Sequence, residues 1–289
     1  MSGPASNIIK TVNISVSNLY VLMGRNYFKR FDKVLSDVWR SYDRDDYNKW
    51  LTNIKKEGII PSTMSPSQQL VELQKKHNIN IMDDVKKCQK SGCAKEMANT
   101  QQQILTTISR QVHTDAKEQI QKLVKDATNT VYGTHQEGGA IKAFEQQSGK
   151  VVSGGQRLFK HSLGTHHNIE WFIVGKIDGE TSDGEIVEIK NRTNKLFGSL
   201  RLYEEPQIMI YMFLANTKNG YLVENLKKKD NCKLGIIPVL YQTNYFESQV
   251  IPSVVRFQKF FVDFIGNNDL KRYLLTGNED LLYQAFMSY

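Results

Sequence analysis

The chain has 289 residues, a formal net charge of +8 and 24% charged side chains, a balance that favours a polyanionic partner. Three cysteines are too few for a disulfide framework, and Cys88 and Cys93 have no further ligands nearby, which argues against a zinc site. The first ten residues lack the pattern of a signal peptide, and no apolar run approaches membrane-spanning length. We therefore expect a soluble, intracellular protein of the nucleus or cytoplasm, without a membrane partner.

The first 128 residues are expected to be mainly helical. Residues 14–39 contain a polar turn followed by a helical pattern, and Ser17 and Asn18 in that turn suit helix N-capping. Residues 60–69, which carry proline and serine, are expected to form a loop. Residues 100–125, rich in glutamine and lysine, are expected to form one long helix.

Residues 131–152 have the spacing of an amphipathic helix, with Gly149 suited to its C-terminal cap. Glu137 falls in the first expected turn, and His135 lies two residues before it. The carboxylate of Glu137 could join an acidic site. A glutamate near a helix N-terminus is also favourable through the helix dipole alone.

The most informative stretch is residues 175–190, which follow an apolar run at residues 171–174. Two apolar runs flank a tight-turn signal at residues 181–184, which predicts a β-hairpin with Asp178 at the end of its first strand. Side chains alternate along a strand, so Glu188 and Lys190 share one face and Ile189 points into the core. Two carboxylates suit Mg²⁺, and a lysine beside them can orient a water or stabilise developing charge. A solvent-facing hairpin of mixed charge fits the stretch equally well.

Residues 206–214 predict a helix that opens on Pro206. Gln207 and Tyr211 are four residues apart and share one face. A core helix explains the apolar residues but not a glutamine in so apolar a run. The remaining strands are expected at residues 150–158, 170–178, 185–191, 220–224 and 235–241, and residues 250–289 are expected to form helices with a break at residues 266–268.

These motifs, in this order, resemble the PD-(D/E)XK nuclease superfamily and, more narrowly, its lambda-type exonuclease and YqaJ-like viral recombinase branch. The matching positions are Gly133 and Glu137 for the G-x-x-x-E helix, Asp178 with Glu188-Ile189-Lys190 for the acidic hairpin, and Gln207 and Tyr211 for the Q-x-x-x-Y helix. The resemblance covers residues 130–225, and Ile177 replaces the proline that often precedes the aspartate.

The resemblance implies an α/β fold in which a mixed central sheet is flanked by helices. Residues 129–289 would form this core with C-terminal helices, and residues 1–128 a helical, DNA-binding annex. The implied activity is metal-dependent DNA hydrolysis, as a 5′→3′ exonuclease on double-stranded DNA in viral-type recombination, replication or repair. The implied cofactors are two Mg²⁺ or Mn²⁺ ions.

The same resemblance implies the roles of the site residues. The metal ligands would be Asp178, Glu188, the backbone carbonyl of Ile189 and Glu137. Lys190 would orient the attacking water, and Gln207 would hold Lys190 or the phosphate. His135 and Tyr211 would be neighbours of the site, and the DNA contacts would come from Ser17, Arg192, Lys195 and Arg201. A single-strand annealing partner, a homo-oligomer and a viral origin also fit this branch.

Three other interpretations remain open. The first is an endonuclease of the same superfamily, which would cut DNA or RNA without a free end. The second is a DNA-binding protein that has kept the fold and lost turnover, although the intact Asp-Glu-Lys set argues against it. The third is a basic scaffold protein, for which the acid spacing and Gln207 would be coincidences.

Overall fold

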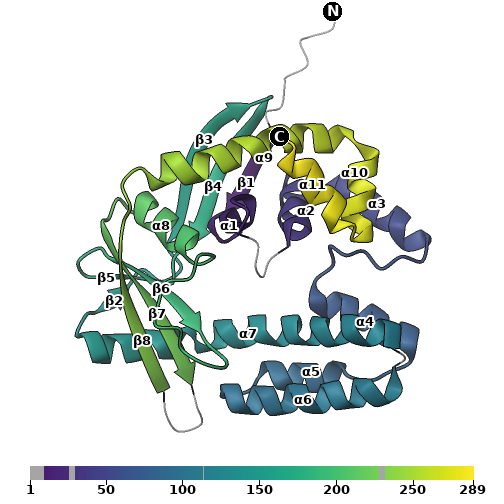
Figure 1. Ribbon diagram of the computed structural model, residues 1–289, viewed down its shortest axis with the longest axis horizontal. Helices are drawn as coiled ribbons and strands as arrows, with labels where there is room; N and C mark the ends of the chain where they lie inside the picture. Colours follow the sequence, from purple (N-terminus) through teal and green to yellow (C-terminus); the bar gives the residue numbers. More distant parts are fainter. Residues whose placement is uncertain (1–9, 26–29, 113, 228–231) are drawn as a thin grey trace, which may run out of the picture.

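The computed structural model describes residues 10–25, 30–112, 114–227 and 232–289 (Figure 1). The side chains of residues 114, 115, 130, 132–135 and 232 also lie outside the described part, so the expected place of His135 is not tested. The chain has the expected mixed α/β fold class, which is confirmed, with its strands divided between two sheets.

The first sheet has the strand order β1-β4-β3, formed by Lys10–Ser15, Ile169–Lys176 and Leu158–His166. The strand β1 runs parallel to β4, with Ile14 opposite Ile173, and β3 is antiparallel to β4. Because side chains alternate along a strand, Ile14, Trp171 and Ile173 all point into the core and are fully buried.

The second sheet has the order β2-β5-β6-β7-β8, formed by Val152–Ser153, Gly179–Thr181, Ile186–Asn191, Asn219–Lys227 and Cys232–Leu240. Of these pairs, β6 and β7 are parallel, and the helix α8 (Glu205–Leu214) lies between them in the chain, as a parallel crossover requires. The tight turn between β5 and β6 is confirmed, since the N–H of Gly184 donates to the carbonyl of Thr181 at 2.9 Å.

The expected hairpin differs from the structure in its first strand. β4 does not pair with β6. The chain leaves the first sheet after Lys176 and enters the second at Gly179, so Asp178 lies at the junction of the two sheets. The strand expected at residues 150–158 is also wrong, because Gly154 and Gln156 have positive φ angles of 64° and 67° and interrupt it.

The largest hydrophobic core contains residues from the N-terminal and the C-terminal parts of the described chain. It combines the first sheet with α1 (Leu19–Leu22), α2 (Phe31–Tyr42), α3 (Arg44–Lys56), α9 (Ile251–Gly266), α10 (Asn268–Thr276) and α11 (Glu279–Met287). Aromatic rings fill it, and Phe31 of α2 stacks on Phe286 of α11 with ring centroids 4.6 Å apart. The helix break expected near residue 267 is confirmed, because the Asn267 side chain accepts hydrogen bonds from the first N–H groups of α10.

A second core belongs to a helical bundle of α4 (Pro66–His77), α5 (Met82–Gln89), α6 (Ala94–Gln111) and the first half of α7 (Thr114–Ser148). The loop expected at residues 60–69 ends earlier than predicted, because Ser65 and Gln68 form a capping box that starts α4 at Pro66. The single helix expected at residues 100–125 is wrong, because Val112 has an extended backbone and separates α6 from α7.

Helix α7 spans 35 residues and links the bundle to the second sheet (Figure 1). Its first half packs in the bundle, and its second half places Ala140 and Phe144 against Val187 and Ile189 of β6. It ends where predicted, with Gly149 at a φ of 72°. Glu137 therefore lies within a continuous helix, not in a first turn, and residue 128, the expected boundary, falls inside α7.

In the described part of the chain, no helix is long and apolar enough to cross a membrane.

Candidate active site

Strand β6 presents Glu188 and Lys190 on the face opposite α7. On this face the Lys190 Nζ donates to Glu188 Oε1 at 2.7 Å and to Gln207 Oε1 of α8 at 3.0 Å. Ile189 points to the other face and is 5% exposed in the contact with α7. The alternation expected from the sequence is therefore confirmed, and the spacing of β6 and α8 brings three of the predicted residues together.

Asp178 reaches the same strand from the junction of the sheets. The N–H of Ile189 donates to Asp178 Oδ2 at 2.8 Å. The N–H and C=O of one strand residue leave the strand on the same edge, so the Ile189 carbonyl also lies on the Asp178 side. Two carboxylates and one carbonyl are thus gathered at one edge of β6.

Glu188 is a buried carboxylate with one oxygen that lacks a hydrogen-bond partner among the residues that the structure describes. The residue is 2% exposed, and its Oε2 atom has no hydrogen-bond partner in the described structure. Burial, together with the negative charge of Asp178, raises the pKa of Glu188 to about 8. Burial also raises the pKa of Asp178, although the Ile189 N–H and the Lys190 charge oppose this.

Lys190 keeps its charge in this setting. Burial alone would lower the pKa of Lys190, but the carboxylates of Glu188, Asp178 and Glu204 together outweigh it, so that the pKa is raised. The site therefore contains a fixed ammonium group next to carboxylates whose pKa values are higher than usual, a pattern common at catalytic centres.

Glu137 approaches the cluster from α7. Its half-buried side chain has a raised pKa, because of burial and because of the negative charge of Asp178, with Lys190 acting in the opposite direction. Glu137 is therefore close enough to Asp178 and Lys190 for their charges to act on its carboxyl group. His135, which the sequence predicted as a neighbour of the site, has a side chain outside the described residues.

The donor set can be compared with the needs of a divalent cation. Within the described ranges, no three acidic, histidine or cysteine side chains form a ready-made metal cage. Mg²⁺ usually takes one or two carboxylates, with water and substrate phosphate completing its shell. Asp178 and the unpartnered Oε2 of Glu188 supply such donors, so the residues present fit a divalent cation.

The raised pKa of Glu188 gives a testable pH dependence. The folded protein binds this proton more tightly than the unfolded chain, whose glutamate has a pKa near 4.5. The resulting stabilisation is fully present below about pH 4.5 and is lost as the pH rises through about 8. In EDTA, Glu188→Gln should therefore gain stability relative to the parent protein as the pH rises from about 4.5 to about 8, with no further gain above that range. Urea unfolding across this range, with exposed Glu118→Gln as control, measures it, and a difference independent of pH would contradict it.

Tyr211 contributes to the scaffold. Its O–H donates to the carbonyl of Lys176 at 2.7 Å, and the residue is 3% exposed. A Cβ atom on Gly175 would lie 2.8 Å from the ring, so glycine allows α8 to approach the end of β4 closely. Tyr211 therefore anchors the segment of chain that leads to Asp178.

Arg192 is not placed as expected. Its guanidinium is 11% exposed and is held by Glu204, at 2.6 and 3.1 Å, and by Glu224, at 2.7 Å. The two carboxylates occupy the donors that a phosphate would need. This arrangement corrects the expected DNA contact and gives Arg192 a structural role between β7 and the start of α8.

The other predicted DNA contacts are exposed. The side chains of Lys195 and Arg201 lie over the ring of Phe197, 5.9 and 4.3 Å from its centroid. Ser17 is exposed and its Oγ lies 2.9 Å from Ser15 Oγ. Ser15 pairs with Val174, so this turn lies at the end of β4 that leads to Asp178. The alternative capping role is not observed, because the Asn18 side chain forms no capping hydrogen bond to α1.

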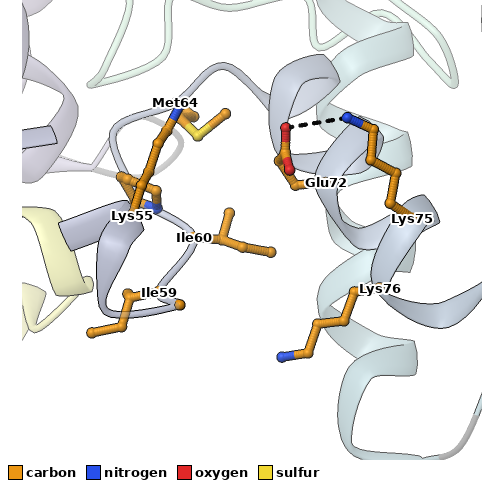
Figure 2. Close-up of a pocket in the computed structure, with 9 residues that line it drawn as sticks. Lys55, Ile59, Ile60, Met64, Glu72, Lys75 and Lys76 are labelled. Atoms are coloured by element: carbon orange, nitrogen blue, oxygen red, sulfur yellow. Dashed lines mark ion pairs between the residues drawn. The ribbon is translucent and has the colours of Figure 1, made fainter. Parts of the chain in front are cut away.

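A hollow of about 450 Å³ lies apart from this site, between the end of α3 and α4 (Figure 2). Its charged lining consists of Lys55, Lys75, Lys76 and Glu72, with Lys75 and Glu72 3.9 Å apart. None of the candidate site residues lines it. The DNA-binding role of the N-terminal region stays a prediction.

The fold and the site define a mixed α/β protein with an acidic, lysine-containing centre. Residues 54–221 match the YqaJ-like viral recombinase domain, and the chain belongs to this family. The resemblance seen in the sequence motifs is thereby confirmed.

Solved structures give distant matches. An alkaline exonuclease, LHK-Exo from Laribacter hongkongensis, is 13% identical, with a TM-score of 0.37 over 75% of this chain and 95% of that chain. LHK-Exo in complex with dAMP is 12% identical, with a TM-score of 0.36 over 63% and 88%. The protein SSO0001 is 16% identical, with a TM-score of 0.35 over 48% of this chain and 63% of its own length. No curated protein matches the chain.

Proposed function

We propose that the protein is a metal-dependent nuclease that hydrolyses DNA phosphodiester bonds, acting as a 5′→3′ exonuclease on double-stranded DNA. The observation that carries this proposal is the chain of hydrogen bonds from the buried Glu188 through the partly buried Lys190 to Gln207, with the free Glu188 Oε2 and Asp178 beside it. Membership of a viral recombinase family supports DNA as the substrate.

The acidic residues would hold the cofactor. Asp178, Glu188 and the Ile189 carbonyl would bind one Mg²⁺ or Mn²⁺ ion, and Glu137 with Asp178 a second. Bound divalent ions neutralise charge on the scissile phosphate and lower the pKa of bound water. Burial raises the pKa values of Glu137, Asp178 and Glu188, and neighbouring carboxylates raise those of Glu137 and Glu188 further. A bound divalent cation would favour the ionised forms of these groups.

Lys190 and Gln207 would act on the reacting groups. A lysine ammonium has three donors, and two of those on Lys190 point to Glu188 and Gln207. The third can bind the attacking water or the scissile phosphate and stabilise charge that develops there. Gln207 fixes Lys190 by accepting its hydrogen bond, so the ammonium is positioned before the substrate arrives.

The direction of digestion rests on the resemblance to the lambda-type branch. The same resemblance favours a homo-oligomer, a single-strand annealing partner and a viral origin. Ser17, Lys195 and Arg201 are the exposed residues that we assign to DNA contacts.

End-labelled DNA tests the function. Linear duplexes labelled at the 5′ or the 3′ end would be incubated with Mg²⁺ or with EDTA, beside a covalently closed circle. We expect Mg²⁺-dependent release of the 5′ label, an intact circle and no activity for Glu188→Ala. A cut circle would assign an endonuclease instead, and an RNA duplex in the same assay tests the substrate class. Binding without any cleavage would leave a DNA-binding protein.

A further inference from the structure

The loop of residues 192–204 is tied to the proposed centre at both ends. It begins two residues after Lys190 at the end of β6 and ends three residues before Gln207 on α8. Its middle is held by Glu224 of β7, which pairs with Lys190 in the second sheet. The part of the loop at Phe197 and Gly198 therefore lies one strand away from Lys190.

Glu224 of β7 fixes the backbone of this loop. The residue is fully buried, and its carboxylate accepts hydrogen bonds from the N–H of Phe197, at 2.9 Å, and of Gly198, at 2.8 Å. Glu224 also binds Arg192, the first residue of the loop. Gly198 has a φ of 68°, which a glycine adopts without strain. The loop is thus built to hold one conformation.

The fixed loop presents two positive charges on an aromatic ring. The guanidinium of Arg201 lies 4.3 Å and the Lys195 ammonium 5.9 Å from the Phe197 centroid. Both side chains are exposed, and neither forms an ion pair with any residue that the structure describes. Arg192 also lies 4.7 Å from the Phe197 centroid, but its charge is balanced by Glu204 and Glu224. Two exposed like charges held together without an acidic partner form a positive patch that favours the binding of an anion.

We propose that Phe197 is the positioning residue of a preformed phosphate clamp, in which its ring holds Arg201 and Lys195 ready to bind the DNA backbone beside the scissile bond. The proposal rests on the proposed function for its substrate. A guanidinium already stacked on a ring loses less conformational freedom when it binds a phosphate. The clamp positions the strand without reading its sequence.

A double-mutant cycle tests this coupling. Binding of a fluorescein-labelled DNA duplex would be measured in EDTA for Phe197→Leu, Arg201→Gln and the double variant. We expect Arg201→Gln to weaken binding roughly tenfold and to reduce the salt slope by about 1. Phe197→Leu should also weaken binding and reduce that slope, whereas the double variant should be no more than about twofold weaker than Arg201→Gln alone.

The controls separate positioning from packing. Phe172→Leu removes a comparable ring, which lies 3.7 Å from Lys160, and should leave DNA binding unchanged. Phe197→Tyr keeps an aromatic face and should show the DNA affinity and the salt slope of the parent protein. This variant still tests the clamp if Phe197→Leu does not fold. Additive effects, an unchanged salt slope for Phe197→Leu, or lost binding in a folded Phe197→Tyr protein would overturn the clamp. If the cycle holds and no DNA is cut, the clamp stands and the nuclease proposal fails.

Discussion

Lys190→Ala is expected to abolish DNA cleavage while DNA binding remains within a few fold of the parent protein. The ammonium is the one positive group that bridges Glu188 and Gln207 in the described site. Its removal takes away the donor that would stabilise charge on the phosphate, and the loss of one such preorganised donor lowers kcat by roughly 10²- to 10³-fold. The rate of label release and the Kd for the same duplex in EDTA measure the two effects.

A nearby lysine provides the matched control. Lys176→Ala removes an exposed side chain at the end of β4, whose backbone carbonyl, not its ammonium, accepts from Tyr211. This variant should cut DNA at the parent rate. Lys190→Arg should not restore activity, because a planar guanidinium cannot replace a compact ammonium between two acceptors. Parent-like cleavage by Lys190→Ala would remove Lys190 from the mechanism.

Arg192→Leu is expected to destabilise the folded protein by about 3–5 kcal/mol. It leaves Glu204 and Glu224, 2% and 0% exposed, without their shared cation. The control is Arg40→Ala, which breaks an exposed pair with Asp37 and should cost less than about 1 kcal/mol. Urea unfolding of both variants gives the comparison.

A compensating variant distinguishes the charge effect from lost packing. Arg192→Leu combined with Glu204→Gln and Glu224→Gln removes the uncompensated charges and should recover part of the lost free energy of unfolding. If the combined variant is less stable than Arg192→Leu, the carboxylates are not the source of the destabilisation. A small loss for Arg192→Leu itself would show that the ion-pair network has little influence on the fold.

The local arrangement of the site could be predicted because it follows from short-range periodicity. The period of two in β6 puts Glu188 and Lys190 on one face, and the helical period in α8 points Gln207 and Tyr211 the same way. The pairing of strands does not follow from periodicity. An apolar run ending near Asp178 looks the same whether its partner is β6 or, as found, β1 and β3.

The buried network around Arg192 was missed for a related reason. A basic residue just after the acidic strand suggests a DNA contact, and only the fold reveals that two carboxylates enclose it. One signal was available. Glu224 directly follows the apolar residues 221–223 of a strand, and a charge buried in such a strand needs a partner. The continuity of α7 through Gly138 and Gly139 also escaped prediction, since packing at both ends overrides the weak helix propensity of glycine.

The parallel pairing of β1 with β4 has a consequence for how the chain folds during synthesis. The first strand leaves the ribosome long before its partner, since Ile14 pairs with Ile173. Meanwhile the helices of the bundle, whose contacts are closer in sequence, can already assemble. The apolar side of β1 must wait, exposed to solvent or to chaperones, until most of the polypeptide has emerged. We therefore expect the helical bundle to become protease-resistant in nascent chains before the first sheet does.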